Sequence, residues 1–148
     1  MSDSVLSIDP LQQRESAVVK RILLIEDDLK LQAIYKNFLQ EAGHETVATH
    51  SCWITLQLLE KNAVDLLITD IMAQDFDGIE LIRILCALPK APPIIAMTGS
   101  ARRIAGVGLL AVAQELGVAG TLQKPFTRME LLDTVDRLLG EGRLRGAG

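Results

Sequence analysis

Five short apolar runs alternate along this chain with longer stretches that have the periodicity of amphipathic helices. Apolar runs of this length between helices are typical of buried parallel strands in α/β folds. The pattern therefore predicts five strand-helix units, with helices on both faces of one open, doubly wound sheet. The predicted strands are residues 22–25, 46–48, 64–68, 94–97 and 118–122.

Residues that cap helix ends predict the helix boundaries. Polar side chains can accept hydrogen bonds from the free N–H groups at a helix start, and glycine adopts the left-handed conformation that ends many helices. The predicted starts are Asp28, Ser51, Asp77 with Glu80, and Thr127 with Glu130, and the predicted ends are Gly43 and Gly117. The apolar faces predicted to be buried are Leu31, Ile34, Phe38 and Leu39; Leu56 and Leu59; Ile79, Ile82, Leu85 and Cys86; Leu109, Val112, Ala113 and Leu116; and Met129, Leu132, Val135 and Leu139.

Length and composition favour one domain that folds unaided. The chain has 148 residues, of which 49% are hydrophobic. A chain of this size can bury about two-thirds of its unfolded surface. We expect an N-terminal extension over 1–19, one domain over 20–140 and a C-terminal tail over 141–148. Cys52 and Cys86 lie in apolar surroundings without CxxC spacing and are predicted to be buried thiols.

The charge and aromatic content argue against a domain that binds nucleic acid or membranes. The net charge is -4 and aromatic residues make up 3%, whereas such surfaces are basic, and single-stranded nucleic acid stacks on aromatic rings. Arginines 102, 103, 143 and 145 form basic spots without a helix-turn-helix motif.

The first residues do not resemble a secretory leader, and no apolar run approaches the ~18 residues of a membrane-spanning helix. We expect a cytoplasmic protein.

Polar residues with a shared chemistry follow four of the predicted strands. They are Glu26, Asp27 and Asp28 after the first, Asp70 after the third, Thr98, Gly99 and Ser100 after the fourth, and Lys124 and Pro125 after the fifth. Carboxyl ends of parallel strands meet at one edge of a sheet, where ligands of open α/β folds bind. Carboxylates gathered there favour Mg²⁺, and a carboxylate beside this cation can attack phosphorus while lysine and hydroxyl groups bind the phosphoryl oxygens. The set predicts phosphoryl transfer to an aspartate.

Four segments that contain these residues resemble the receiver domains of two-component response regulators. The segments are RILLIEDD, LLITDIMAQDFDGIEL, PPIIAMTGS and GTLQKPF, in the order of the family and near its spacing. The resemblance spans about residues 20–139. It implies a flavodoxin-like (βα)5 sheet with the strand order 2-1-3-4-5.

The resemblance also implies a role for each matching residue. The roles are Asp70 as phosphate acceptor; Glu26, Asp27, Asp70 and the backbone carbonyl of Met72 as Mg²⁺ ligands; Thr98 as the hydroxyl that turns toward the phosphoryl group; and Lys124 as the lysine that pairs with it. The bond from this lysine to Pro125 is commonly cis in the family. Asp28 matches a variable acid, which we assign to the cap of the first helix.

Three features depart from the family pattern. Ala73 and Gln74 replace a frequent Met-Pro pair, so the loop over the acceptor loses a rigid proline. Thr121 stands where the family usually has an aromatic residue that is coupled to the threonine in signalling. An insertion is expected within 99–106, beside the face through which such domains usually signal. We therefore expect a change in the mobility of this loop or in the lifetime of the phosphate, and an unusual choice of partners.

Three other kinds of site fit the sequence less well than a phosphate-accepting site of the receiver type does. Residues 106–111 fit the dinucleotide pattern GxGxxA, but no strand directly precedes them. His44, His50 and Cys52 lack a fourth zinc ligand. Metal-dependent phosphohydrolases usually carry a second acid two residues after the nucleophile, where this chain has Met72.

The residues and the resemblance together predict a stand-alone receiver that is not an enzyme beyond slow hydrolysis of its own aspartyl phosphate. A sensor histidine kinase or a histidine phosphotransfer protein would donate the phosphoryl group to Asp70, with Mg²⁺ as cofactor. Output would pass to a downstream protein through the fourth and fifth strand-helix units, or onward by phosphorelay, and a homodimer is possible. The alternative is a receiver-like binding module that works without phosphorylation.

Overall fold

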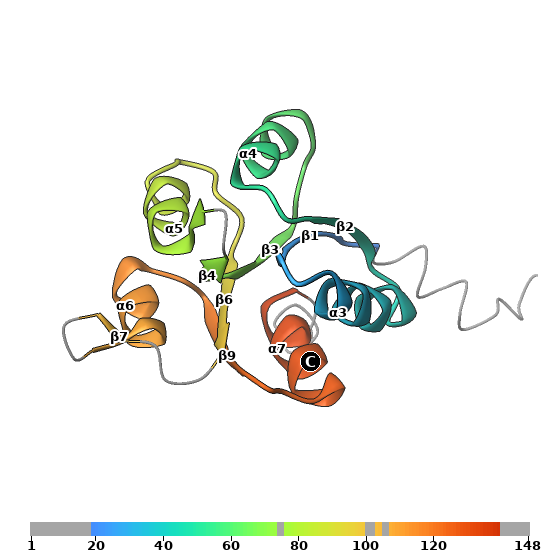
Figure 1. The fold of residues 1–148 in the computed structure, drawn as a ribbon. Coiled ribbons are helices and arrows are strands. Elements are labelled where there is room, and N and C mark those ends of the chain that lie inside the picture. Colours follow the sequence, from blue (N-terminus) through green and yellow to red (C-terminus); the bar gives the residue numbers. More distant parts are fainter. Residues whose placement is uncertain (1–18, 74–75, 100–102, 105–106, 140–148) are drawn as a thin grey trace, which may run out of the picture.

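One five-stranded parallel sheet forms the centre of the molecule (Figure 1). The computed structural model describes residues 19–73, 76–99, 103–104 and 107–139. The strands lie in the order β2-β1-β3-β6-β9, which is 2-1-3-4-5 when these five are counted along the chain, so the predicted sheet is confirmed. The bounds are β1 Arg21–Ile25, β2 Glu45–Thr49, β3 Leu66–Asp70, β6 Ile94–Gly99 and β9 Gly120–Lys124.

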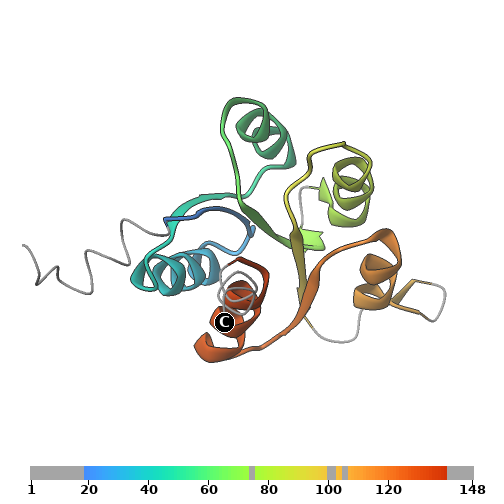
Figure 2. The same ribbon diagram turned by 180° about the vertical axis from the view of Figure 1, so that it is seen from behind.

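Helices cover both faces of this sheet (Figures 1 and 2). Two of them, α3 and α7, lie side by side on one face, and α4, α5 and α6 cover the other. This arrangement confirms the predicted double winding, in which each helix connects one parallel strand to the next. The bounds are α3 Leu29–Glu41, α4 Cys52–Lys61, α5 Gly78–Cys86, α6 Leu109–Leu116 and α7 Arg128–Leu139.

Burial on both faces explains why the central strands are apolar throughout. Successive side chains of a strand point to opposite faces. In β1, Leu23 and Ile25 pack toward α4, α5 and α6, and Ile22 and Leu24 pack toward α3 and α7. All four are at most 1% exposed. A strand covered on both faces therefore needs a continuous aliphatic run, which is what the sequence shows.

The predicted caps Asp28 and Ser51 are confirmed by side-chain hydrogen bonds. Asp28 accepts hydrogen bonds from the backbone N–H groups of Lys30 and Leu31, at 2.9 and 3.2 Å, at the start of α3. Ser51 accepts one from the N–H of Ile54, at 3.2 Å, at the start of α4. The predicted left-handed glycines are Gly43, with φ 97°, and Gly117, with φ 109°.

The capping box at the start of α7 provides one test of these assignments. Thr127 Oγ1 accepts from the N–H of Glu130 at 3.0 Å, and Glu130 Oε1 accepts from the N–H of Thr127 at 2.8 Å. Because Thr127→Ala removes the first bond, we expect the free energy of unfolding, measured in urea, to fall by about 1 kcal/mol. Thr127→Ser keeps the hydroxyl and is the matched control. An equal loss in both variants would contradict the role of the cap.

Three side chains predicted to be buried are exposed. Ile34 is 46% exposed, Met129 is 71% exposed, and Cys86 is also exposed. In α3 the side chain one position later, Tyr35, faces the core instead, and in α7 Leu131 does so. Cys86 and Met129 lie in the terminal turns of their helices, where the apolar stripe no longer faces the sheet.

Three strands, β3, β6 and β9, end two residues later than the predicted runs, and two of them end on candidate site residues. The apolar pattern stops before Asp70 and Lys124, but the hydrogen-bonded ladders continue to both residues. Asp70 pairs in register with Met97 of β6, and Lys124 pairs with Gly99. The sheet itself therefore holds the backbone of both candidate residues.

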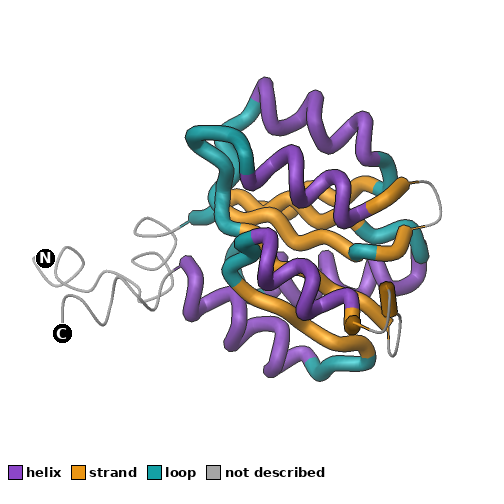
Figure 3. The backbone as a smooth tube through the Cα atoms, turned by 90° about the vertical axis from the view of Figure 1, so that its left-hand side faces the viewer, coloured by secondary structure: helices purple, strands orange, loops and turns teal. Residues whose placement is uncertain are grey.

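Two short antiparallel hairpins follow β3 and β6 near the carboxyl ends of the strands (Figure 3). The first pairs β4, Met72–Ala73, with β5, Phe76–Asp77, and leads directly into α5. The second pairs β7, Arg103–Ile104, with β8, Val107–Gly108, and leads into α6. Neither hairpin was expected from the sequence. The second one lies partly in the predicted insertion over 99–106.

Several sequence predictions fall outside the described residues. The two predicted tails fall outside, apart from Val19, and so do Gln74, Ser100 and part of the predicted insertion. The side chains of Cys52, Met72 and Asp77 also fall outside. Within the part of the chain that the structure describes, no helix has the length and apolarity needed to cross a membrane.

We expect a buried nitrogen of His44 to make the stability of the fold dependent on pH. Nδ1 of His44 is buried and has no hydrogen-bond partner among the described residues. Burial lowers the pKa of His44 more strongly than the charge of Asp136 raises it, and the charge of Lys20 also lowers it. The folded protein therefore disfavours the protonated imidazole, whereas the unfolded chain accepts the proton below about pH 6.5.

We expect His44→Gln to reduce the loss of stability between pH 7 and pH 5. In this variant, protonation at position 44 no longer favours the unfolded chain. The free energy of unfolding should therefore fall less steeply with pH, by at most about 1.4 kcal/mol per pH unit. Urea unfolding at a series of pH values measures it. His50→Gln, at an exposed position, is the matched control. The same pH dependence in wild type and His44→Gln would contradict this assignment.

Candidate functional site

The candidate site lies at the carboxyl ends of β1, β3 and β9. Glu26 and Asp27 directly follow β1, Asp70 is the last residue of β3, and Lys124 is the last residue of β9. These strands are not neighbours in sequence, but the sheet places their ends at one edge. The structure therefore brings together four of the residues that the sequence predicts for the site.

Three carboxylates form the acidic part of the site. Glu26, Asp27 and Asp70 each offer an oxygen, and these oxygens all lie within 4.8 Å of one another. Glu26 is fully buried, Asp70 is 5% exposed, and Asp27 is half-buried. Negative charges this close together in a partly dry environment repel one another and need a cation.

Lys124 supplies one such cation. Its Nζ donates to Glu26 Oε1 at 2.5 Å and to Asp70 Oδ2 at 2.8 Å, and its side chain is 13% exposed. Burial raises the pKa of Glu26, although the hydrogen bonds from Lys124 and from the N–H of Asp28 act against it. Burial alone would lower the pKa of Lys124, but the hydrogen bonds to Asp70 and Glu26 outweigh it and raise that pKa. The lysine therefore stays protonated.

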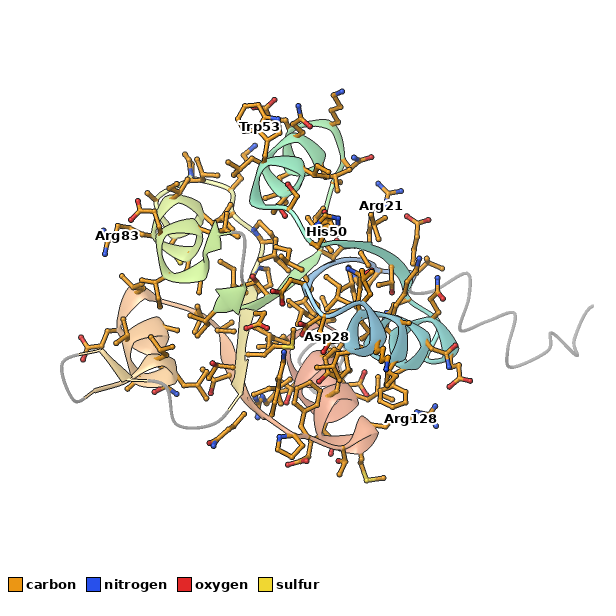
Figure 4. All side chains as sticks on the ribbon, viewed as in Figure 1. Arg21, Asp28, His50, Trp53, Arg83 and Arg128 are labelled. Atoms are coloured by element: carbon orange, nitrogen blue, oxygen red, sulfur yellow. The ribbon has the colours of Figure 1, made fainter. Side chains whose placement is uncertain are left out.

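The turn after β1 fixes the direction of the Glu26 carboxylate. Oε2 of Glu26 accepts a hydrogen bond from the N–H of Asp28 at 3.1 Å, and the backbone carbonyl of Glu26 accepts one from Gln32 Nε2 at 2.9 Å. Asp28 in turn caps α3, and Figure 4 labels it at the start of this helix. The contribution of Gln32 was not predicted, because it depends on one turn of helix placing its amide over the end of β1.

Thr98 lies on the neighbouring strand β6 and carries a buried hydroxyl. The residue is 2% exposed, and its Oγ1 has no hydrogen-bond partner among the described residues. An unpartnered buried hydroxyl costs about 1–3 kcal/mol, so such groups in folded proteins usually have a role that requires them. Thr98 is therefore available to donate to an oxygen of a bound ligand.

The donor set fits a hard divalent cation. Mg²⁺ prefers carboxylate and carbonyl oxygens and keeps water or substrate oxygens in its remaining positions. Glu26, Asp27 and Asp70 form a group of this kind, and Met72 follows Asp70 by two residues with its carbonyl in the short strand β4. Histidine and cysteine ligands, which favour zinc, do not belong to this group.

Comparison with known proteins identifies the family. The family model of the response regulator receiver domain matches residues 22–136. The chain belongs to this family. Response regulator protein FleR of Pseudomonas aeruginosa is 32% identical over 117 residues, which cover 79% of this chain and 24% of FleR. Transcriptional regulatory protein CpxR of Escherichia coli is 29% identical over 121 residues, which cover 82% of this chain and 50% of CpxR. This receiver domain therefore spans half or less of the curated relatives it matches.

Solved structures confirm the fold. The receiver domain of TorR, the response regulator of the TMAO respiratory system, is 28% identical, with a TM-score of 0.72 over 80% of this chain and 95% of that structure. A response regulator from Chloroflexus aurantiacus is 26% identical, with a TM-score of 0.72 over 82% of this chain and 98% of that structure. The resemblance noted in the sequence and the strand order 2-1-3-4-5 are thus confirmed.

One departure from the family pattern can be located in this receiver domain. Thr121 is half-buried on β9, where it pairs in register with Ala96 of β6. The only tyrosine of the chain, Tyr35, lies on α3 and packs on the face of the sheet that α3 and α7 cover. The expected cis bond between Lys124 and Pro125 is present.

Proposed function

We propose that this receiver domain accepts a phosphoryl group on Asp70, with Mg²⁺ held by Glu26, Asp27, Asp70 and the backbone carbonyl of Met72. The position of Asp70 is the observation that carries the proposal. Its carboxylate is buried, lies within 4.8 Å of two further carboxylate oxygens, and is 2.8 Å from the ammonium of Lys124. A nucleophilic carboxylate in phosphoryl transfer needs this combination of cation binding and fixed donors.

The transfer step follows from the chemistry of these groups. A carboxylate oxygen of Asp70 attacks phosphorus and forms the new O–P bond, while the bond from phosphorus to the donor breaks. The leaving group, an imidazole nitrogen of a phosphohistidine or the acetate of acetyl phosphate, takes the electron pair of that bond. Bound Mg²⁺ supplies charge that neutralises the phosphoryl oxygens. Lys124 and the hydroxyl of Thr98 donate hydrogen bonds to the same oxygens as charge develops.

Phosphorylation by a small donor tests this function. We expect wild type incubated with acetyl phosphate and Mg²⁺ to gain the mass of one phosphoryl group, detected by intact mass spectrometry. Asp70→Asn should gain none, because an amide oxygen is a poor nucleophile at this position. Addition of EDTA should suppress the gain in wild type. Asp133→Asn, which changes an exposed acid on α7, is the matched control and should react normally. A phosphoryl adduct on Asp70→Asn would refute Asp70 as the acceptor.

We further propose the signalling context expected from the sequence. A sensor histidine kinase or a histidine phosphotransfer protein would be the donor, in the cytoplasm, and hydrolysis of the aspartyl phosphate would be the limit of catalysis. Output would pass through the face formed by β6, α6, β9 and α7, or by phosphorelay. The assignment of residues 20–140 to the receiver domain belongs to this proposal as well.

A second candidate is a binding module that works without phosphorylation. The replacement of the usual aromatic residue by Thr121 on β9 favours it, because the family couples phosphorylation to output at that position. Binding of a kinase or downstream protein, measured for wild type and Asp70→Asn with and without acetyl phosphate, separates the two functions. Equal binding in all four cases supports the module, and binding that requires both Asp70 and acetyl phosphate supports the receiver.

A further inference from the structure

Two aromatic rings stack between helix α3 and the segment that follows β9. Tyr35 of α3 is 5% exposed, and its ring lies 4.8 Å from that of Phe126, centroid to centroid, at an interplanar angle of 25°. Phe126 follows Lys124 by two residues. The stack thus joins helix α3 to the segment that carries the lysine of the site. Stacked pairs of this geometry stabilise a contact by about 0.5–1.5 kcal/mol beyond their buried area.

The hydroxyl of Tyr35 lies within the electrostatic influence of the site. Burial raises the pKa of Tyr35, the charge of Lys124 lowers it, and the charges of Glu26, Asp70 and Asp28 raise it. Tyr35 packs in the core on the α3 and α7 face of the sheet, together with Phe126. None of the interactions proposed for phosphoryl transfer uses this buried side chain.

Lys124 needs an anchor of this kind because of its position in the sheet. Among the described strands, β9 lies at the edge of the sheet and pairs with β6, and Lys124 is its last residue. A lysine side chain loses up to about 2 kcal/mol of rotational freedom when it is held in one place. The next residue, Pro125, is exposed. Phe126, which is partly buried, is therefore the first side chain after the lysine that packs against the core on the α3 and α7 face.

We propose that Tyr35 is a positioning residue for phosphoryl transfer: by stacking on Phe126 it fixes the end of β9 and thereby holds the Lys124 ammonium between Glu26 and Asp70. This inference rests on the proposed function of Asp70. The ring does the positioning, so the hydroxyl is dispensable. A small displacement of a catalytic donor is costly, since misplacement by about 1 Å can slow a reaction by up to about 10²-fold.

The rate of phosphorylation by acetyl phosphate tests the proposal in four variants. Tyr35→Leu and Phe126→Leu each remove one partner of the stack, and the second variant covers the case in which the first does not fold. Tyr35→Phe keeps the ring. Phe38→Leu is the matched control, because Phe38 lies on the same helix, is also partly buried, and faces the guanidinium of Arg128 at 6.0 Å rather than Phe126. Urea unfolding of each variant establishes that it is folded under the assay conditions.

We expect both stack variants to lower the maximal rate by roughly tenfold, with the half-saturating concentration of acetyl phosphate changed by less than about twofold. Tyr35→Phe should restore the rate, and Phe38→Leu should react as wild type does. Wild-type rates in both stack variants would overturn the positioning role and leave the acceptor assignment standing. A slow Tyr35→Phe or a slow Phe38→Leu would also overturn it. A wild type that takes no phosphoryl group would refute the proposed function and this inference with it.

Discussion

Gly78→Ala is expected to lower the free energy of unfolding by about 3 kcal/mol or more, enough to unfold much of the population of a marginally stable domain. Gly78 is the first residue of α5, and its N–H donates to the carbonyl of Ile71 at 3.0 Å. A Cβ built on Gly78 would lie 2.5 Å from Cα and 2.7 Å from the carbonyl carbon of Ile71. Both are backbone atoms, so no side-chain rotation relieves the clash.

The consequence of this substitution extends to the site. Ile71 is fully buried and follows Asp70 directly, so backbone movement at Ile71 displaces the acceptor. Gly108→Ala is the matched control, because a Cβ there meets no atom of the described residues within 4 Å and the residue also stands at a helix start. It should change stability by less than about 1 kcal/mol. Urea unfolding compares the two variants, and equal stability losses would show that close approach to Ile71 is not what requires glycine.

The close approach at Gly78 illustrates what the sequence could not reveal. The sequence contains Asp77-Gly78 before an apolar stripe, which predicts the helix start correctly. The requirement for glycine arises because the backbone returns to Ile71 across the β4-β5 hairpin. Local sequence patterns report local periodicity, and each strand of this hairpin is only two residues long, too short for alternation to be visible.

The convergence of the site, in contrast, could be predicted. Glu26, Asp27 and Asp70 follow apolar runs, and parallel strands must bring such residues to one edge. The two hydrogen bonds of Lys124 and the buried hydroxyl of Thr98 needed the structure, because they depend on how far each strand continues. The stack of Tyr35 on Phe126 could not be predicted either, since a helical stripe can include either of two adjacent positions, and the sequence favoured Ile34.

Lys124→Met is expected to destabilise the protein by about 3 kcal/mol at pH 7, because it removes the cation from two buried carboxylates without removing the carboxylates. The side chains of Glu26 and Asp70 are 1% and 8% exposed, so water replaces little of the lost interaction. The pKa of Glu26 is already raised by burial and rises further without the ammonium.

The pH dependence of this loss distinguishes it from a simple packing defect. A carboxyl group whose pKa is raised in the folded state destabilises the fold when it is ionised. The penalty is absent below the pKa of the unfolded chain, grows as pH rises from that value to the raised pKa of the folded state, and is constant above it. Urea unfolding should therefore show a larger difference between wild type and Lys124→Met at pH 8 than at pH 5. Mg²⁺ should stabilise Lys124→Met more than wild type, since its carboxylates lack the competing ammonium.

Lys124→Arg and Lys124→Met together separate the charge from its position. Arginine keeps the positive charge beside Glu26 and Asp70, but its planar fork cannot place one nitrogen where the ammonium lies. We therefore expect Lys124→Arg to retain most of the stability and to show the pH dependence of wild type, while its rate of phosphorylation by acetyl phosphate falls. A loss in Lys124→Met that is the same at pH 5 and pH 8 and is insensitive to Mg²⁺ would mean that the lysine contributes through its aliphatic chain alone. The ion pairs with Glu26 and Asp70 would then not be what stabilises the carboxylates at the ends of β1 and β3.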